Sequence, residues 1–134
     1  MKKVTVFVAT AFAAIISMGI ATAPSMAKSA LLQRLDTDKD GTLDASEIEQ
    51  AAAAVFDRLE KDGDGTVDRK ELGARLGKKD FAQGDPDKDG TLSRDEFLAL
   101  VQKLFKEADV DNEGTLDARE LRSKAGRALA RIVD

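Results

Sequence analysis

The sequence predicts a compact, all-α helical bundle in which four 12-residue loops are joined by single short helices. The first observation behind this prediction is an internal repeat, because four segments align without gaps: DTDKDGTLDASE, EKDGDGTVDRKE, DPDKDGTLSRDE and DVDNEGTLDARE. The second is that successive repeats begin only 24, 25 and 24 residues apart. The third is that apolar residues between repeats recur with the 3.6-residue period of a helix.

The N-terminal stretch, residues 1–27, has the features of a secretory signal peptide. Two lysines precede an uncharged run at 4–23, and Ser25-Met26-Ala27 places small residues where signal peptidase cuts, so cleavage is expected before Lys28. An uncleaved membrane anchor is the alternative, because the apolar run is about long enough to span a bilayer. We expect a 28–134 domain that is periplasmic or secreted, without stable membrane association after cleavage.

Composition restricts the chemistry of this domain. The chain contains no His, Cys, Trp or Tyr, and its three Met all lie within residues 1–27. Zinc, haem, iron–sulfur and thiol chemistry therefore lack ligands, and disulfides are excluded. We expect no enzymatic activity, because the carboxylates belong to the loops and no His, Cys or Tyr stands beside them. Residues 28–134 have 19 basic and 25 acidic residues, a net charge of −6, and no nucleic-acid partner is expected.

The repeat has the pattern of an EF-hand calcium loop. Each copy has acidic residues at positions 1, 3 and 5, Gly at position 6, Thr at position 7, an aliphatic residue at position 8 and Glu at position 12. Hard divalent cations take six to eight oxygens at about 2.3–2.6 Å, which alternating acidic side chains can supply. Glycine allows the sharp turn, the position-7 carbonyl adds a ligand, and the long glutamate reaches back to bind through both oxygens.

Up to four Ca²⁺ ions are therefore expected, one in each loop. The predicted ligands of loops 1 and 2 are Asp36, Asp38, Asp40, Thr42, Asp44 and Glu47, and Glu60, Asp62, Asp64, Thr66, Asp68 and Glu71. Those of loops 3 and 4 are Asp85, Asp87, Asp89, Thr91, Ser93 and Glu96, and Asp109, Asp111, Glu113, Thr115, Asp117 and Glu120. Glu60 and Glu113 are one methylene longer than Asp, so loops 2 and 4 are expected to be strained or weakened, although all four are expected to bind.

The connections between loops have room for one helix only. After the 12-residue loops are subtracted, 12 or 13 residues remain between neighbours. Apolar residues spaced as on one helical face occur between loops 1 and 2 (Ile48, Ala52, Val55, Phe56, Leu59) and between loops 3 and 4 (Phe97, Val101, Leu104, Phe105, Ala108). At 1.5 Å per residue, such a helix holds its two loops about 20 Å apart. Loop 1 therefore cannot pair with loop 2, nor loop 3 with loop 4.

The middle connection is expected to bend. Gly73 and Gly77 interrupt it, and 78–83 has the character of a separate short turn that carries Phe81. A bend would bring loops 2 and 3 together and leave loops 1 and 4 to meet at the other end; a straight connection would instead pair loop 1 with loop 3 and loop 2 with loop 4. We favour the bend. The aliphatic residues at position 8 are expected in the core, where they pair as short antiparallel strands.

The last helix is expected to follow Glu120 directly, with Leu121, Ala125, Leu129 and Ile132 on one face.

The short loop spacing, the signal peptide, Asp at position 9 and the ending SKAGRAL together resemble lanmodulin and its calcium-binding periplasmic relatives. This resemblance implies a periplasmic three-helix bundle whose four loops bind lanthanides selectively. Lanmodulin loops often combine Pro at position 2 with Asp at position 9, whereas here Pro86 shares its loop with Ser93.

Three functions follow from these features. The first is calcium binding by a small exported protein, as a buffer or as a metal-dependent folding switch. The second is selective lanthanide binding, because loops 1, 2 and 4 each offer five carboxylates and loop 3 offers four. The third is a calcium sensor acting through a protein partner, which is disfavoured because the mature chain lacks the methionines of an adaptable docking groove.

Overall fold

The computed structural model describes residues 30–134, so the predicted signal peptide lies outside the described residues. The helices are α1 (Ala30–Leu35), α2 (Ala45–Leu59), α3 (Arg69–Leu72), α4 (Lys78–Gly84), α5 (Arg94–Ala108), the 3₁₀ helix η1 (Glu120–Arg122) and α6 (Lys124–Val133). The strands are β1 (Leu43–Asp44), β2 (Thr66–Asp68), β3 (Thr91–Ser93) and β4 (Thr115–Leu116). Among residues 30–134, no helix has both the length and the apolar character needed to cross a membrane.

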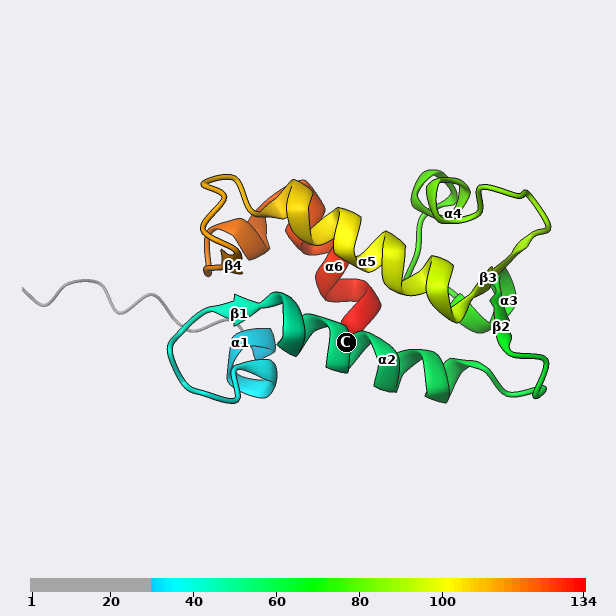
Figure 1. The fold of residues 1–134 in the computed structure, drawn as a ribbon, viewed down its shortest axis with the longest axis horizontal. Coiled ribbons are helices and arrows are strands. Elements are labelled where there is room, and N and C mark those ends of the chain that lie inside the picture. The colour runs from blue at the N-terminus through cyan, green and yellow to red at the C-terminus, as the bar shows by residue number, and fades with distance from the viewer. Residues whose placement is uncertain (1–29) are drawn as a thin grey trace, which may run out of the picture.

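Two 15-residue helices, α2 and α5, form the body of the molecule and run between its two ends (Figure 1). Helix α6 packs against both. Their contact faces are the ones the helical period predicted, with Phe56 and Phe97 in a tilted ring contact at 5.5 Å between centroids. Single helices therefore connect loop 1 to loop 2 and loop 3 to loop 4, as predicted.

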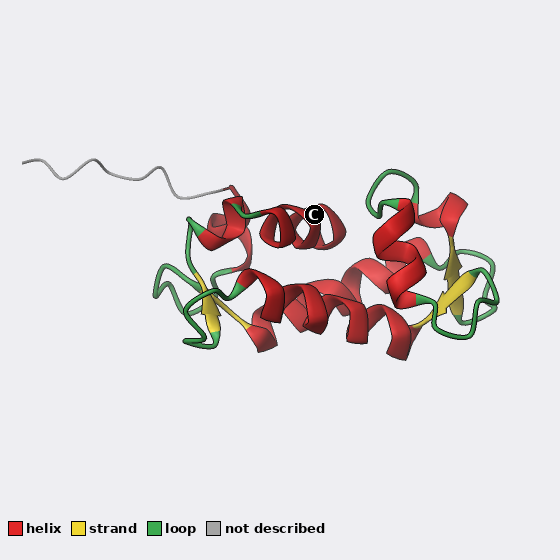
Figure 2. Ribbon diagram, turned by 90° about the horizontal axis from the view of Figure 1, so that it is seen from above, coloured by secondary structure: helices red, strands yellow, loops and turns green. Residues whose placement is uncertain are grey.

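Each end of the molecule is closed by a small antiparallel sheet (Figure 2). Strand β1 pairs with β4, with Leu43 opposite Leu116, and β2 pairs with β3, with Val67 opposite Leu92. These four aliphatic side chains are all 0% exposed. The bent connection is confirmed, because loops 2 and 3 meet at one end while loops 1 and 4 meet at the other.

The bend itself is built differently from the prediction. Helix α3 ends after four residues at Gly73, whose φ of 55° lies in the left-handed region that favours glycine. The segment predicted as a turn at 78–83 is instead the helix α4, which buries Phe81. A helix forms there because no glycine interrupts 78–83, and the apolar Phe81 anchors it to the core.

The C-terminal helix also departs from the prediction. The single helix expected after Glu120 is broken at Ser123, where η1 ends and α6 begins. The Ser123 hydroxyl accepts a hydrogen bond from the Gly126 N–H at 2.9 Å and so caps α6. Leu121, Leu129 and Ile132 are nevertheless buried as predicted, and Ala125 packs against the core. Both helical pieces contribute buried side chains to the core.

Candidate metal centres

The backbone of every loop curls around its own first carboxylate. The position-6 glycines have φ values of 82–92°, and their N–H groups donate to the position-1 carboxylates. The donor–acceptor distances are 3.0 Å in loop 1, 3.4 Å in loop 2, 3.1 Å in loop 3 and 3.0 Å in loop 4. The weakest of these bonds involves Glu60, the longer side chain that the sequence singled out. Its extra methylene places the carboxylate less favourably than an aspartate would.

Acidic oxygens converge inside each loop. One group of three acidic side chains per loop brings one oxygen each to within 4.8 Å of the others. These groups are Asp36, Asp38 and Asp40; Glu60, Asp62 and Asp64; Asp85, Asp87 and Glu96; and Asp109, Asp111 and Glu120. Half of the 24 predicted ligands are thereby placed together. The donor set consists of oxygen alone, which fits a hard cation such as Ca²⁺.

Three of the position-1 aspartates are withdrawn from solvent. Asp36, Asp85 and Asp109 are 9%, 7% and 9% exposed. Within residues 30–134, neither Asp85 nor Asp109 forms an ion pair with a basic side chain. Burying a carboxylate is unfavourable unless positive charge or hydrogen bonds compensate it. Backbone N–H groups compensate part of the charge of Asp85 and Asp109, and a bound cation would neutralise the rest.

The crowding of carboxylates is visible in the pKa of Asp87 in loop 3. The backbone N–H of Asp89 lowers this pKa, but partial desolvation and the nearby acidic groups of Asp85, Asp89 and Glu96 outweigh it, so that the pKa is raised. Protonation is one way to relieve repulsion among acids, and binding a cation is another. A cation bound beside Asp87 would therefore relieve the repulsion that raises its pKa.

Position 5 is oriented by the threonine at position 7 in three of the loops. The Thr N–H and hydroxyl both donate to the position-5 aspartate, at 2.7–2.8 Å in loop 1 and at 2.8 Å in loops 2 and 3. Within the described part of the chain, Thr115 makes no such hydrogen bonds to Glu113. The longer side chain therefore lacks the restraint that its counterparts have, in keeping with the predicted weakness of loop 4.

Position 9 has a structural role that the sequence did not reveal. The side chains of Asp44, Asp68 and Ser93 accept hydrogen bonds from the N–H of the glutamate three residues later, and so cap α2, α3 and α5. In return, each glutamate accepts the position-9 N–H, at 2.9–3.2 Å across the four loops. This capping box joins position 12 to the first turn of the following helix. Asp117 makes the same contacts before η1.

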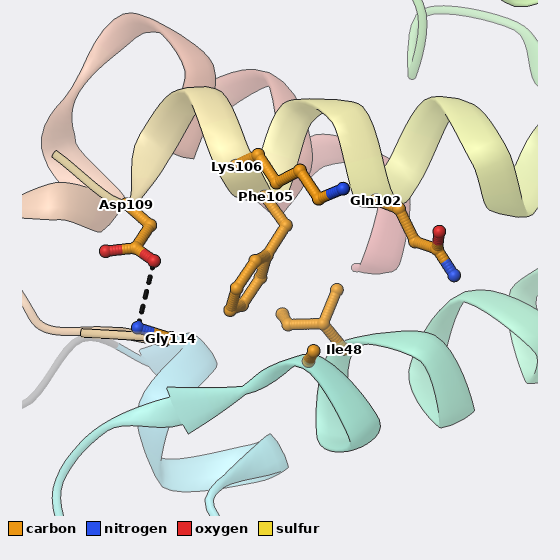
Figure 3. A pocket seen from close by; sticks show the side chains of 7 residues that line it. Ile48, Gln102, Phe105, Lys106, Asp109 and Gly114 are labelled. Carbon is orange, nitrogen blue, oxygen red and sulfur yellow. Dashed lines mark hydrogen bonds between the residues drawn. The ribbon is translucent and has the colours of Figure 1, made fainter. Parts of the chain in front are cut away.

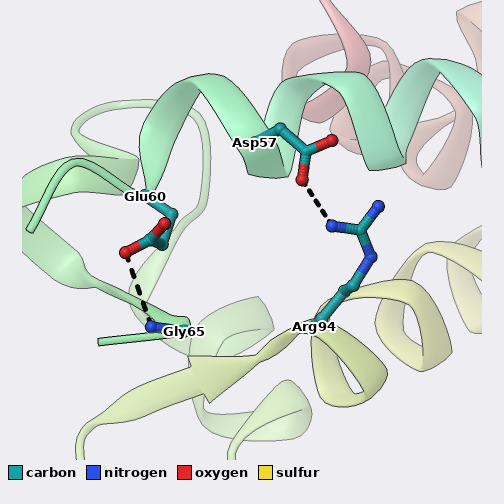
Figure 4. Close-up of polar contacts among 4 residues, drawn as sticks. All are labelled: Asp57, Glu60, Gly65 and Arg94. Carbon is teal, nitrogen blue, oxygen red and sulfur yellow. Dashed lines mark hydrogen bonds and ion pairs between the residues drawn. The ribbon is translucent and has the colours of Figure 1, made fainter. Parts of the chain in front are cut away.

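The two ends of the molecule carry further contacts around the loops. At the end formed by loops 2 and 3, Arg94 forms an ion pair with Asp57 and lies over the Phe56 ring, while Glu60 accepts the Gly65 N–H (Figure 4). At the other end, Ile48 and Phe105 line an apolar pocket of about 280 Å³ beside loop 4 (Figure 3). Asp109, which accepts a hydrogen bond from the Gly114 N–H, forms part of the pocket wall. The pocket therefore adjoins a predicted metal ligand.

The arrangement of four acidic loops flanked by helices defines an EF-hand protein. Residues 25–102 match the family model described as an EF-hand domain pair, and residues 100–123 match the one described as an EF hand. The first match covers more than half of the sequence, so the chain belongs to the EF-hand family. A search of the curated proteins finds no match. EF-hand domains bind metal ions of the calcium type.

The structure brings the position-1 and position-3 acids together in every loop, but only some of the remaining predicted ligands join them. Position 5 completes the groups of loops 1 and 2, whereas position 12 completes those of loops 3 and 4. The position-9 residues of all four loops and the position-7 threonines of loops 1, 2 and 3 lie in the hydrogen-bonded frame described above. That all 24 residues bind an ion stays a prediction.

Proposed function

We propose that this chain is an exported calcium-binding protein in which each of the four loops holds one ion and binding is coupled to folding. The observation that carries this proposal is the convergence of three acidic oxygens within 4.8 Å in every loop of an EF-hand chain. Calcium would supply the positive charge that these groups lack. Periplasmic or secreted localisation rests on the signal peptide expected at residues 1–27.

Coupling to folding follows from where the glutamates stand. Position 12 lies in the first turn of α2, α3 and α5 and at the start of η1. Its side chain bridges the helix start and the loop, because its two oxygens accept hydrogen bonds from positions 2 and 9 in loops 1, 2 and 4. Fixing this carboxylate on an ion therefore also fixes the helix relative to its loop. Relief of the repulsion among acids adds to the stabilisation.

Selective lanthanide binding is a second candidate, as in the lanmodulins that the sequence resembles. The position-9 aspartates favour it, because they raise the number of carboxylates to five in loops 1, 2 and 4, and a trivalent ion leaves less residual repulsion. Each of these aspartates accepts the capping hydrogen bond through Oδ1, so Oδ2 is the oxygen that could bind an ion without breaking the cap. We rank calcium first because position 9 commonly acts through water in calcium loops.

A competitive titration distinguishes the two candidates. The full-length sequence is expressed for export, the N-terminus of the purified chain is determined by mass spectrometry, and bound metal is removed with a chelator. Calcium or lanthanum is then added while helicity is followed by circular dichroism and stoichiometry by calorimetry. We expect up to four calcium ions to bind, in the micromolar to millimolar range typical of EF-hand sites, with a gain in helicity.

The control is the chain with all four position-12 glutamates replaced, Glu47→Gln, Glu71→Gln, Glu96→Gln and Glu120→Gln. This variant keeps side-chain size but removes one charge from each loop, so stoichiometric calcium uptake should be lost. Tight lanthanum uptake with a negligible calcium response would establish the lanthanide alternative instead. A wild-type chain that binds neither ion would refute both.

A further inference from the structure

The position-12 glutamates are not held equally in the four loops. In loops 1, 2 and 4, Oε1 of the glutamate accepts the backbone N–H of position 2, at 2.6 Å from Thr37, 3.2 Å from Lys61 and 2.8 Å from Val110. In loop 1 the Thr37 hydroxyl donates to the same oxygen at 2.8 Å. Hydrogen bonds to a carboxylate are among the stronger ones in proteins. These three glutamates are therefore already engaged.

Loop 3 has no such hydrogen bond, because its position 2 is Pro86 and proline has no N–H. The Ser93 N–H and hydroxyl donate to Oε2 of Glu96, at 2.9 and 2.8 Å. Within residues 30–134 no donor reaches the other oxygen, Oε1. Glu96 also belongs to the converging group with Asp85 and Asp87. It is thus in place among the acids with one oxygen uncommitted.

From this difference, and resting on the proposed function, we infer that loop 3 is the first loop to load and that the position-2 residue sets the order. An oxygen that already accepts a hydrogen bond must share or exchange that bond when it binds an ion. Loop 3 can begin to bind an ion through Oε1 of Glu96 without exchanging any hydrogen bond, which the other three loops cannot do. A net protein hydrogen bond corresponds to roughly a three- to tenfold change in an equilibrium constant.

Loop 1 is the matched competitor of loop 3. Both have Asp at positions 1, 3 and 5, Thr at position 7 and a position-1 side chain less than a tenth exposed. They differ at position 2, at position 9, where Asp44 gives loop 1 an additional carboxylate, and at positions 10 and 11, which are Ala45 and Ser46 in loop 1 but Arg94 and Asp95 in loop 3. Asp44 directs Oδ1 to the helix start, which it caps. The effects of positions 2 and 9 oppose each other, and exchanging position 2 alone isolates its contribution from that of the other differences.

The remaining loops are weaker competitors for separate reasons. Loop 2 begins with Glu60, which accepts the Gly65 N–H at 3.4 Å, the longest of the four bonds between position 6 and position 1. Glu113 of loop 4 lacks the restraint from threonine that position 5 has elsewhere within the described chain. Loop 2 shares a sheet with loop 3, however, so its filling is expected to follow loop 3 closely.

The position-6 glycines provide one reporter per loop, because their N–H groups donate to the position-1 carboxylates. The purified chain is labelled with ¹⁵N-glycine, stripped of metal and titrated with substoichiometric calcium chloride, and the Gly41, Gly65, Gly90 and Gly114 amide signals are followed. Gly90 should change first, followed by Gly65. If the signal of Gly41, Gly65 or Gly114 changed before that of Gly90, the inference would be overturned.

Two reciprocal variants test the cause. Pro86→Thr restores the N–H and should lower the calcium affinity of loop 3 roughly three- to tenfold, so that Gly90 loses its lead. Thr37→Pro removes both donors to Oε1 of Glu47 and should move Gly41 forward. Pro86 of loop 3 shows that the loop backbone accommodates proline at this position. An unchanged order in a variant that still binds calcium would refute the role of position 2. If no glycine signal responds to calcium in the wild type, it is the proposed calcium binding that fails.

Discussion

At the residue scale, the loops adopt the left-handed backbone conformation twice, at position 6 and at position 4. Position 4 is Lys39, Gly63, Lys88 and Asn112, with φ values of 63°, 78°, 60° and 58°. Glycine at position 6 was recognised in the sequence, but position 4 was missed. Gly63 and Asn112 are typical of this conformation, but lysine rarely adopts it. The two lysines therefore made the conformation of position 4 unpredictable from the sequence.

The pKa values of two loop aspartates are shifted in opposite directions: Asp38, at position 3 of loop 1, and Asp64, at position 5 of loop 2. For Asp38, the Asp40 N–H lowers the pKa, but desolvation and the neighbouring carboxylates of Asp40 and Glu47 outweigh it, so the pKa is raised. For Asp64, hydrogen bonds from the Thr66 hydroxyl and N–H lower the pKa. Where the folded state raises the pKa of a carboxyl group, ionisation of that group lowers the stability of the folded chain as the pH rises. Where the folded state lowers the pKa, ionisation of the group stabilises the folded chain.

The metal-free protein should therefore respond in opposite ways to removal of these charges. Asp38→Asn should raise the thermal unfolding midpoint at neutral pH in the presence of chelator, because it removes a repulsive charge and keeps an acceptor for the Asp40 N–H. Asp64→Asn should lower the midpoint, because a neutral acceptor holds Thr66 more weakly. Each variant is the control for the other. Shifts of the same sign would contradict the electrostatic account.

At the scale of the elements, helices could be predicted where apolar residues kept the helical period throughout a connection whose length was fixed by the loops on either side. Helices α2 and α5 satisfy both conditions, and so does the pairing of loops that follows from them. Helix α1, which precedes loop 1, was not predicted because Leu31, Leu32 and Leu35 are too few to define a period. The break at Ser123 was missed because serine is tolerated within helices, and only the fold shows that its hydroxyl acts as a cap.

Gly126 explains how α6 lies so close to η1. A Cβ built on Gly126 would collide with the Glu120 carbonyl oxygen and lie 2.7 Å from the Leu121 Cα, so only glycine permits this approach. A Cβ at Gly84 would instead meet the end of the flexible Leu100 side chain at 2.9 Å. The first contact is with backbone, which cannot move without shifting loop 4.

Gly126→Ala should consequently destabilise the protein by at least about 1–3 kcal/mol, the usual cost of overpacking. Gly84→Ala is the matched control, since both substitutions place alanine in a helix, and it should cost less because a side chain can rotate away. Chemical denaturation in the presence of chelator measures both. A Gly126→Ala protein as stable as the wild type would show that α6 does not dock as described.

At the scale of the whole molecule, the loops are coupled in the pairs 1 with 4 and 2 with 3. Replacing one ligand at one end should weaken its sheet partner and spare the other end. Glu120→Gln should thus lower the calcium affinity of loop 1, reported by the Gly41 amide, while the Gly65 and Gly90 signals stay as in the wild type. Glu71→Gln should do the reverse, weakening loop 3. Equal weakening of all loops would indicate that coupling runs through the helices instead.

The two sheets close rings of very different length within one chain. Val67 and Leu92 are 25 residues apart, whereas Leu43 and Leu116 are 73 apart. The entropy of ring closure makes the longer ring costlier by about 1 kcal/mol. The sequence has no cysteine that could cross-link the longer ring. Ions in loops 1 and 4 would therefore stabilise its closure reversibly. Chelation would then open the molecule from the end where loops 1 and 4 meet.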